Sequence, residues 1–527
     1  MSHFVGVLMG FAVMVFVPRS LGPVNFGYFE FVTDNFTTIL TTLSLSFPSA
    51  YFYWISRKGH KENCDVATGV NILWHVGVII FFAVFLGASV AGGFHSYIWP
   101  KIPVWVLWSG LFFAGFSFLF QFLNYIADGR ALTVDLERFR MAQNILRASG
   151  LAILFFIGFL TLRTYFLLQT SVLAMIVLGL GVQLARKKAL NPMSFGLWRH
   201  RWRDIAAYLT FTKDYVKPLL WLYLFNVGYS LYDRWFLQVI GGPEEQGFYG
   251  IAFKFGALAF IFTSAMTPIL TREFAHAYEE GDKERLRGLF NRIQVFLFIA
   301  TVCGVYISVQ SGNIVRLVAG KEFLPAVVPI SIMALYPIHQ TFGQLSAALL
   351  LSTGQTRLFG IIGILVMVLG VPLTYFLIAP RRFPLPGMEM GAMGLAIKMI
   401  VVQIIGTNLQ LYFNARYLGF SFAKWLWFQA RVIAIVYTIA GLSKMTERLG
   451  DVHWNDHIAG MWLPKNAALH TVLPKMVFFG MTYFLLVAIL ITVYPSIAGI
   501  SCDEIKRYFI GPATGRIARS LRRRKGR

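Results

Sequence analysis

Residues 19–29 read RSLGPVNFGYF, and residues 239–249 read VIGGPEEQGFY. A shift of 220 residues aligns Gly22-Pro23 with Gly242-Pro243 without a gap, and the following glycine and aromatic pair also coincide. Proline disfavours continuation of a helix, and glycine tolerates backbone conformations that other residues avoid. Each stretch therefore predicts a tight link between two helices. The recurrence at one fixed offset indicates an internal duplication.

Long apolar runs flank both stretches. Of the 527 residues, 57% are hydrophobic and 13% are charged, whereas a soluble domain averages about 25% charged residues. This composition excludes an ordinary soluble protein and predicts an all-α integral membrane protein of about fourteen spans, since a span needs about 20 apolar residues. The predicted spans are 3–17, 28–52, 68–92, 103–127, 145–162, 165–185, 217–240, 248–271, 289–309, 325–349, 357–379, 391–413, 426–443 and 475–498.

The duplication also predicts how the spans are grouped. The two Gly-Pro stretches follow the first and the seventh span, so the copies enter the membrane in the same direction and form a parallel repeat. We expect two pseudo-twofold-related six-helix lobes and two additional helices. The predicted boundaries are 1–185 for the first lobe, 186–217 for a basic linker, 218–413 for the second lobe, 414–498 for the additional helices and 499–527 for a basic tail.

The basic residues predict the orientation of the chain. Of 47 lysines and arginines, 31 follow even-numbered spans and 11 lie on the opposite side. Cytoplasmic loops collect Lys and Arg, so both termini are predicted to be cytoplasmic. The first run lacks a basic start and a small-residue cleavage site, which favours a retained helix over a signal peptide. We interpret the net charge of +23 as topology and not as nucleic-acid binding.

Two basic segments are predicted to meet the membrane surface. In the linker, Arg199, Arg201 and Arg203 alternate with Trp198 and Trp202. This pattern suits a helix that lies against anionic lipid headgroups at the cytoplasmic interface, and a plain linker is the alternative. The arginine-rich tail suggests a juxtamembrane lipid anchor more than a nucleic-acid patch.

Five of the ionisable residues inside predicted spans are the most informative: Asp34, Asp233, Arg234, Lys254 and Lys398. A charged side chain at the centre of a membrane helix costs about 2.5–3.5 kcal/mol and usually faces a partner or a hydrated cavity. At 1.5 Å per residue all five are predicted about 10 Å below the outer surface. Asp34 and Lys254 are related by the repeat, so we expect them to pair when the outer side is closed. The alternative is that the lysines extend to the interface.

These residues and a few neighbours form the predicted site. The candidates for substrate binding in a central cavity are Arg19, Arg234, Lys254, Lys398 and His339, and those for gating or ion coupling are Glu30, Asp34 and Asp233. Asn71, His75, Gln340 and Gln344 could contact sugar hydroxyls, although a hydrogen bond between helices is the default for such residues. Asp233 and Arg234 are neighbours and must point to different sides of a helix.

The order of these landmarks resembles the polysaccharide flippases of the multidrug/oligosaccharidyl-lipid/polysaccharide exporter (MOP) superfamily. The resemblance rests on Arg19, Leu21, Gly22, Pro23, Phe26, Gly27, Tyr28 and Phe29, and on Asp233-Arg234, the turn 242–249, Gly320-Lys321 and the stretches 351–354 and 391–396. It covers about residues 1–415. It implies two six-helix lobes in a V around a cavity, and transfer of undecaprenyl-diphosphate-linked oligosaccharide from the inner to the outer leaflet of the bacterial cytoplasmic membrane. Relatives often have a longer amphipathic start than this chain.

Other classes fit the sequence less well. The chain has no phosphate-binding loop for ATP, no paired-cysteine metal motif and no catalytic triad, so we predict a transporter without cofactor rather than an enzyme. The alternatives are a cation-coupled multidrug exporter of the same superfamily, or a glycan polymerase or ligase using His453, Asp456 and His457 in an outer loop. Polysaccharide polymerase or export proteins are expected as partners of a flippase.

Overall fold

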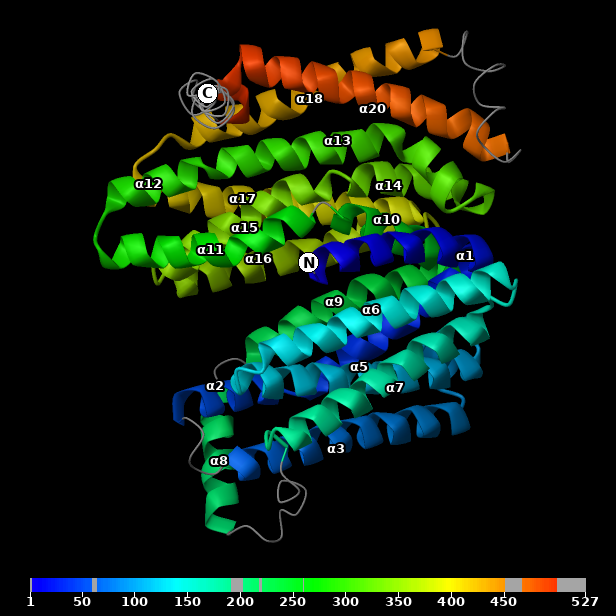
Figure 1. The fold of residues 1–527 in the computed structure, drawn as a ribbon, viewed down its shortest axis with the longest axis vertical. Coiled ribbons are helices and arrows are strands. Elements are labelled where there is room, and N and C mark those ends of the chain that lie inside the picture. Colours follow the sequence, from blue (N-terminus) through cyan, green and yellow to red (C-terminus); the bar gives the residue numbers. More distant parts are fainter. Residues whose placement is uncertain are drawn as a thin grey trace, which may run out of the picture. The chain divides into compact units, whose positions relative to one another are not determined.

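The computed structural model describes residues 2–58, 64–190, 202–217, 220–258, 260–450 and 467–499 (Figure 1). His453, Asp456 and His457, the basic residues Arg199 and Arg201, and the tail beyond residue 499 lie outside the described residues. The chain divides into two compact units. Unit 1 comprises 1–250, 318–323 and 371–395, and unit 2 comprises 251–317, 324–370 and 396–527.

Unit 1 is built mainly from the first nine helices. They are α1 (Ser2–Leu43), α2 (Phe47–Lys58), α3 (Cys64–Ala91), α4 (His95–Ile98), α5 (Val104–Gly129), α6 (Thr133–Phe156), α7 (Leu162–Arg186), α8 (Trp202–Val216) and α9 (Leu220–Ile240). The first half of α10 (Gly242–Leu258) completes the continuous part of this unit. The helices α3, α5, α6 and α7 run side by side, and α8 crosses their direction (Figure 1).

Unit 2 holds most of the remaining elements. They are α11 (Phe260–Glu279), α12 (Lys283–Asn291), α13 (Ile293–Val318), η4 (Lys321–Ala326), α14 (Val327–Met333), α15 (Tyr336–Ser352), α16 (Thr356–Ile378), α17 (Gly391–Leu418), α18 (Phe422–Gly450), α20 (Ala467–Val493) and η5 (Pro495–Ala498). Two short stretches, at 318–323 and 371–395, belong to unit 1 instead.

Every predicted span coincides with a helix or with consecutive helices. Within the described residues, nine helical segments are long and apolar enough to cross a membrane by themselves, and no strand occurs. The helices that carry the Gly-Pro turns, α1 and α10, are not among these nine. The prediction of an all-helical, multi-pass membrane protein is confirmed.

The first two predicted spans are joined more tightly than the sequence pattern suggested. Within α1, Gly22 has φ 69° and ψ 172°, and it separates two helices that follow each other without a loop. Gly242, its equivalent in the repeat, has φ 77° at the junction of α9 and α10. A positive φ is readily adopted by glycine alone. Asp34 therefore lies twelve residues beyond the turn, about 18 Å along the helix.

Aromatic packing holds each unit together. In unit 1 the buried core near the start of α3 joins Tyr51, Trp54, Phe122 and Tyr208. In unit 2 one cluster runs from α11 through α13 and α15 to the last two helices. The α20 residue Tyr483 is fully buried and its hydroxyl donates to the Val302 carbonyl at 2.9 Å. The two additional helices are therefore integral to unit 2, since close packing and hydrogen bonds drive helix association in lipid.

Candidate functional site

The two Gly-Pro turns meet in a reciprocal crossing of α1 and α10. A Cβ atom added to Gly27 would lie 1.7 Å from the Pro243 carbonyl oxygen, and one added to Gly247 would lie 2.1 Å from the Pro23 carbonyl oxygen. Both contacts are related by the 220-residue shift, as a pseudo-twofold repeat requires. Only glycine lets the two backbones approach this closely.

The same crossing places a carboxylate beside its own repeat partner. Glu30 and Gly250 are equivalent positions, and a Cβ added to Gly250 would lie 3.0 Å from Glu30 Cγ. Residues equivalent in a twofold repeat come together only near the axis that relates them. Glu30, predicted from the sequence as a gating residue, thus lies at the pseudo-symmetry axis of the two turns.

Arg234 on α9 is the centre of a buried polar cluster. Its Nε lies 3.4 Å from Asp34 Oδ2, and its Nη1 donates to Gln246 Oε1 at 3.1 Å. Its guanidinium also stands over the Tyr249 ring, 4.6 Å from the centroid. The arginine side chain is 12% exposed and the aspartate side chain is 53% exposed. Gln246 returns a hydrogen bond from Nε2 to the Arg234 carbonyl, which fixes α9 against α10.

Asp233 points away from this cluster. Its Oδ1 accepts a hydrogen bond from Thr374 Oγ1 at 2.7 Å, and both residues are buried. Glu245 is similarly held, because its carboxylate accepts the Ala392 backbone N–H at 2.6 Å. That N–H lies in the first turn of α17, where the helix dipole favours an anion. Unit 1 therefore places three carboxylates in three separate surroundings.

Arg19 lies beside the first turn. It is exposed, and its Nε donates to the Val318 carbonyl at 2.9 Å. A Cβ at Gly22 would lie 2.8 Å from the Glu322 carboxylate, so the acidic residue sits against the same turn. The predicted role of Arg19 as a binding residue stays a prediction.

One arginine inside a span was not selected from the sequence. Arg147 on α6 lies within reach of the Tyr165 hydroxyl on α7. The side chain of Gln169 and the carboxylate of Glu30 also lie close to this hydroxyl. The sequence did indicate Arg147, because this charged residue lies at the edge of a predicted span. Tyr165 and Gln169 carried no signal, because neutral polar residues in apolar helices are common helix contacts.

The unit 2 candidates lie in a different environment. Lys398 on α17 is fully buried, and Lys254 on α10 is half-buried. His339 on α15 is 8% exposed, and its backbone carbonyl accepts a hydrogen bond from Thr407 Oγ1 at 3.0 Å. The predicted pair of Asp34 and Lys254 joins residues of the two units and stays a prediction. Within unit 1 the ionic partner of Asp34 is Arg234.

The neutral polar residues mostly serve helix contacts. Asn71 Nδ2 donates to the Tyr208 hydroxyl at 2.6 Å, and Gln340 Oε1 accepts the Tyr336 hydroxyl at 3.3 Å. His75 is fully buried between the rings of Phe118 and Phe122, with centroids at 4.6 and 4.2 Å. The default expectation of a hydrogen bond between helices is confirmed for Asn71, whereas the bond of Gln340 lies within α15.

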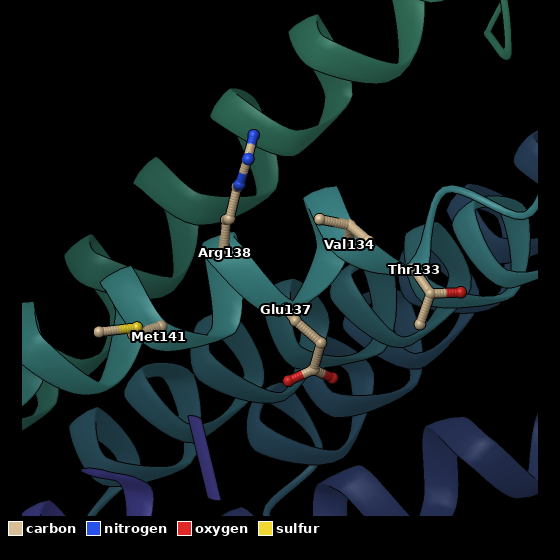
Figure 2. Close-up of a pocket in the computed structure, with 5 residues that line it drawn as sticks. All are labelled: Thr133, Val134, Glu137, Arg138 and Met141. Carbon is tan, nitrogen blue, oxygen red and sulfur yellow. The ribbon is translucent and has the colours of Figure 1, made fainter. Parts of the chain in front are cut away.

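A shallow hollow lies at the start of α6. Its volume is about 320 Å³, and Thr133, Val134, Glu137, Arg138 and Met141 line it (Figure 2). Arg138 and Glu137 point to different sides of the helix in Figure 2, and Glu137 pairs with Arg140 at 2.7 Å. None of the predicted site residues lines this hollow.

The geometry around Arg234 permits an exchange of anions. A guanidinium binds carboxylate and phosphate through the same donors, and such charge-assisted bonds are about twice as strong as neutral ones. Arg234 is held by Gln246 and Tyr249 whatever happens to the ion pair, whereas Asp34 is half-exposed. Asp34 is therefore the partner that can leave at the lower cost.

Three solved structures are similar to this chain. The lipid II flippase MurJ, in an inward closed conformation, has a TM-score of 0.62 at 12% identity, covering 93% of this chain and 97% of its own. A multidrug resistance MATE family transporter of the MOP superfamily, in an inward-facing conformation, has a TM-score of 0.58 at 15% identity, covering 80% and 96%. A MOP superfamily transporter from Pyrococcus furiosus has a TM-score of 0.53 at 14% identity, covering 79% and 94%.

Comparisons of sequence alone give a different result: no family model and no curated protein matches the chain. The structural likenesses show the fold. The chain has the fold shared by MOP superfamily flippases and exporters, which confirms the resemblance inferred from the Gly-Pro stretches and their spacing.

Proposed function

We propose that this protein is a flippase that moves undecaprenyl-diphosphate-linked oligosaccharide from the inner to the outer leaflet of the bacterial cytoplasmic membrane. Transport proceeds by alternating access of two six-helix lobes, 1–185 and 218–413, with both termini in the cytoplasm. The transported unit serves surface polysaccharide synthesis, such as lipopolysaccharide or exopolysaccharide. Lipid-linked oligosaccharide is its partner, and polymerase or export proteins are further expected partners.

The observation that carries this proposal is the arginine cluster on α9. Arg234 is an intramembrane cation, preoriented by Gln246 and Tyr249, whose acidic partner Asp34 is half-exposed. A diphosphate can replace the Asp34 carboxylate on the guanidinium, because both are anions that bind it in two-point fashion. A cationic drug would instead be repelled by this arginine. Arg19, Lys254, Lys398 and His339 are the further candidates for contacts with the diphosphate and its sugars.

The extent of the structural likeness also supports a lipid substrate. The match to the lipid II flippase covers 93% of this chain, whereas the two transporter matches cover 79 and 80%. The flippase likeness therefore extends further along the chain than the exporter likenesses do.

The second candidate is a cation-coupled multidrug exporter. It is favoured by the buried carboxylate of Asp233 and the half-buried carboxylate of Glu245, since a carboxylate inside a membrane helix suits a proton or a cation. In a flippase, the same Asp233 and the axial Glu30 would couple transport to an ion gradient or time the opening of a gate.

Transport into vesicles distinguishes these functions. The purified protein is reconstituted with a fluorescent undecaprenyl-diphosphate oligosaccharide, and outward-leaflet label is measured with a membrane-impermeant quencher. We expect Arg234→Gln to lower the transfer rate at least about tenfold, the loss of one charge-assisted contact. Arg163→Gln is the matched control, because Arg163 is an exposed arginine that stacks on Trp105 at 5.2 Å.

Three outcomes would contradict the proposal. Transport of cationic dyes without transfer of the lipid would favour the exporter. An equal loss of transfer rate in Arg163→Gln would show that Arg234 has no special role in transport. Glycosyl transfer by the purified protein would identify a polymerase or ligase instead.

A further inference from the structure

Helix α8 stands apart from the spans in its direction and its sequence. It runs across the direction of α3 and α7 at the end of the bundle where α2 ends (Figure 1). This end carries the excess of lysine and arginine, which makes it the predicted cytoplasmic side. An amphipathic helix in this orientation lies in the plane of the membrane surface.

The inner face of α8 is firmly attached to unit 1. Tyr208 is 1% exposed, and its hydroxyl accepts a hydrogen bond from Asn71 Nδ2 on α3 at 2.6 Å. Phe211 packs against Trp54 on α2 at a centroid distance of 4.7 Å, and Tyr215 stacks on Tyr53 at 5.6 Å. These contacts hold α8 at a fixed height relative to α2 and α3, so it is not a loose linker.

The outer face of α8 combines an aromatic ring with basic side chains. Trp202 is 75% exposed and Leu209 is 39% exposed. Arg203, Lys213 and Lys217 are exposed as well. Tryptophan concentrates at the membrane–water interface, and long basic side chains extend from there toward headgroups.

The charge of the surrounding segment selects the headgroup. Residues 186–217 contain eight lysines and arginines against two aspartates, Asp204 and Asp214. A basic segment beside a membrane is attracted to anionic phospholipids, by a factor of about five for each Lys or Arg near the surface. Zwitterionic headgroups offer no such attraction.

We infer that α8 is a docking site for anionic phospholipid headgroups, which its outer face binds while the Asn71–Tyr208 hydrogen bond and the aromatic stack fix its inner face to unit 1. This inference does not depend on the substrate that the protein transports. Anionic lipid on the cytoplasmic side would thus stabilise α8 on the bundle and, through Asn71, the cytoplasmic end of α3.

Hydrogen–deuterium exchange of α8 tests the inference. The full chain is placed in nanodiscs of phosphatidylcholine alone or of phosphatidylcholine with phosphatidylglycerol, and exchange is followed in peptides from 202–217. We expect exchange to be at least about fivefold slower with phosphatidylglycerol, the effect of one basic contact. The triple variant Arg203→Glu, Lys213→Glu and Lys217→Glu should lose this protection, and α5 should exchange as before.

A matched triple variant provides the control. Arg287→Glu, Arg357→Glu and Lys424→Glu reverse three exposed charges on the same predicted side of the membrane, outside α8. This variant should keep the lipid-dependent protection of α8. Equal protection in both lipid compositions, or equal loss in both triple variants, would overturn the inference.

A second variant keeps the test informative if charge reversal unfolds the helix. Tyr208→Phe retains the buried ring and removes only the hydroxyl that Asn71 contacts. We expect α8 to exchange faster in both lipid compositions while phosphatidylglycerol still slows it. Loss of the lipid effect in Tyr208→Phe would show that headgroups do not bind α8 by its outer face.

Discussion

Arg234 and Asp34 meet across two halves of an internal repeat, with Nε and Oδ2 3.4 Å apart. One residue lies on α9 and the other on the second helix of α1, so the pair joins the two segments that carry the Gly-Pro turns. The pair is also asymmetric, since the arginine is buried and the aspartate is half-exposed. This asymmetry determines what each substitution should do.

Replacing the two partners should have unequal effects on stability. Arg234→Gln removes the bonds to Asp34 and Gln246 and the contact with Tyr249, and we expect a loss of about 2–3 kcal/mol in the free energy of unfolding. Asp34→Asn should cost less, about 1 kcal/mol, because Gln246 and Tyr249 still hold the guanidinium and the carboxylate is half in solvent. Thermal unfolding in nanodiscs measures both. A larger loss for Asp34→Asn would contradict this account.

The glycine crossing should be the least tolerant part of unit 1. Gly27→Ala and Gly247→Ala place a methyl group 1.7 and 2.1 Å from a carbonyl oxygen, and the two helices must separate to accept either. We expect each to cost at least about 3 kcal/mol or to prevent folding. The control is Gly77→Ala on α3, where nothing lies within 4 Å of the added atom. It should be neutral or stabilise by up to about 1 kcal/mol. Yield of folded protein by size-exclusion chromatography separates these outcomes.

Much of the fold follows from the sequence because it rests on simple constraints. Apolar runs of membrane length give the fourteen spans, and a Gly-Pro pair repeated at 220 residues gives the two turns. Because Asp233 and Arg234 are neighbours on one helix, their side chains were predicted to point to different sides of it. All of these depend on the spacing of residues along one helix.

The partners of the charged residues could not be predicted in the same way. They depend on how one helix is rotated against another, which the repeat does not fix. Symmetry suggests Lys254 for Asp34, which stays a prediction, and the repeat gave no indication that Arg234 is the ionic partner of Asp34 within unit 1. Nothing in the sequence indicated that Gln246 and Tyr249 contact Arg234, since these contacts exist only after α9 and α10 have packed together.

An ion pair at the predicted cytoplasmic end of unit 1 should make stability depend on pH. Asp135 in the first turn of α6 bonds to the Lys187 ammonium, which, together with Arg138, holds the pKa of the carboxyl below its usual value of 3.8. A lowered pKa in the folded state stabilises the protein at a pH above the unfolded value, and this stabilisation is lost as the pH falls through the folded value. Lys187→Met should therefore lower the melting temperature at pH 7.

The difference between the two proteins should shrink below about pH 4, the range in which the unfolded carboxyl becomes protonated. Melting temperatures of the natural protein and of Lys187→Met, recorded from pH 3 to pH 8 at one salt concentration, measure it. A difference that stays constant over the whole range would show that Lys187 stabilises by packing of its aliphatic chain and not by charge.

The hydrogen bond between Thr374 and Asp233 should stabilise unit 1. Thr374 Oγ1 donates to Oδ1 at 2.7 Å, and both side chains are buried. Thr374→Val keeps the shape and removes the donor, and a hydrogen bond to an ionised group contributes about 1.5–3 kcal/mol. We expect Thr374→Val to lower the free energy of unfolding by about 1–3 kcal/mol, and Asp233→Asn combined with Thr374→Val should cost no more than Thr374→Val alone. The control is Thr438→Val, whose exposed hydroxyl donates only to the Ala434 carbonyl of its own helix turn, and it should change stability by less than about 0.5 kcal/mol. A loss at Thr374 no greater than that of the control would show that the hydroxyl of Thr374 does not stabilise unit 1 through Asp233.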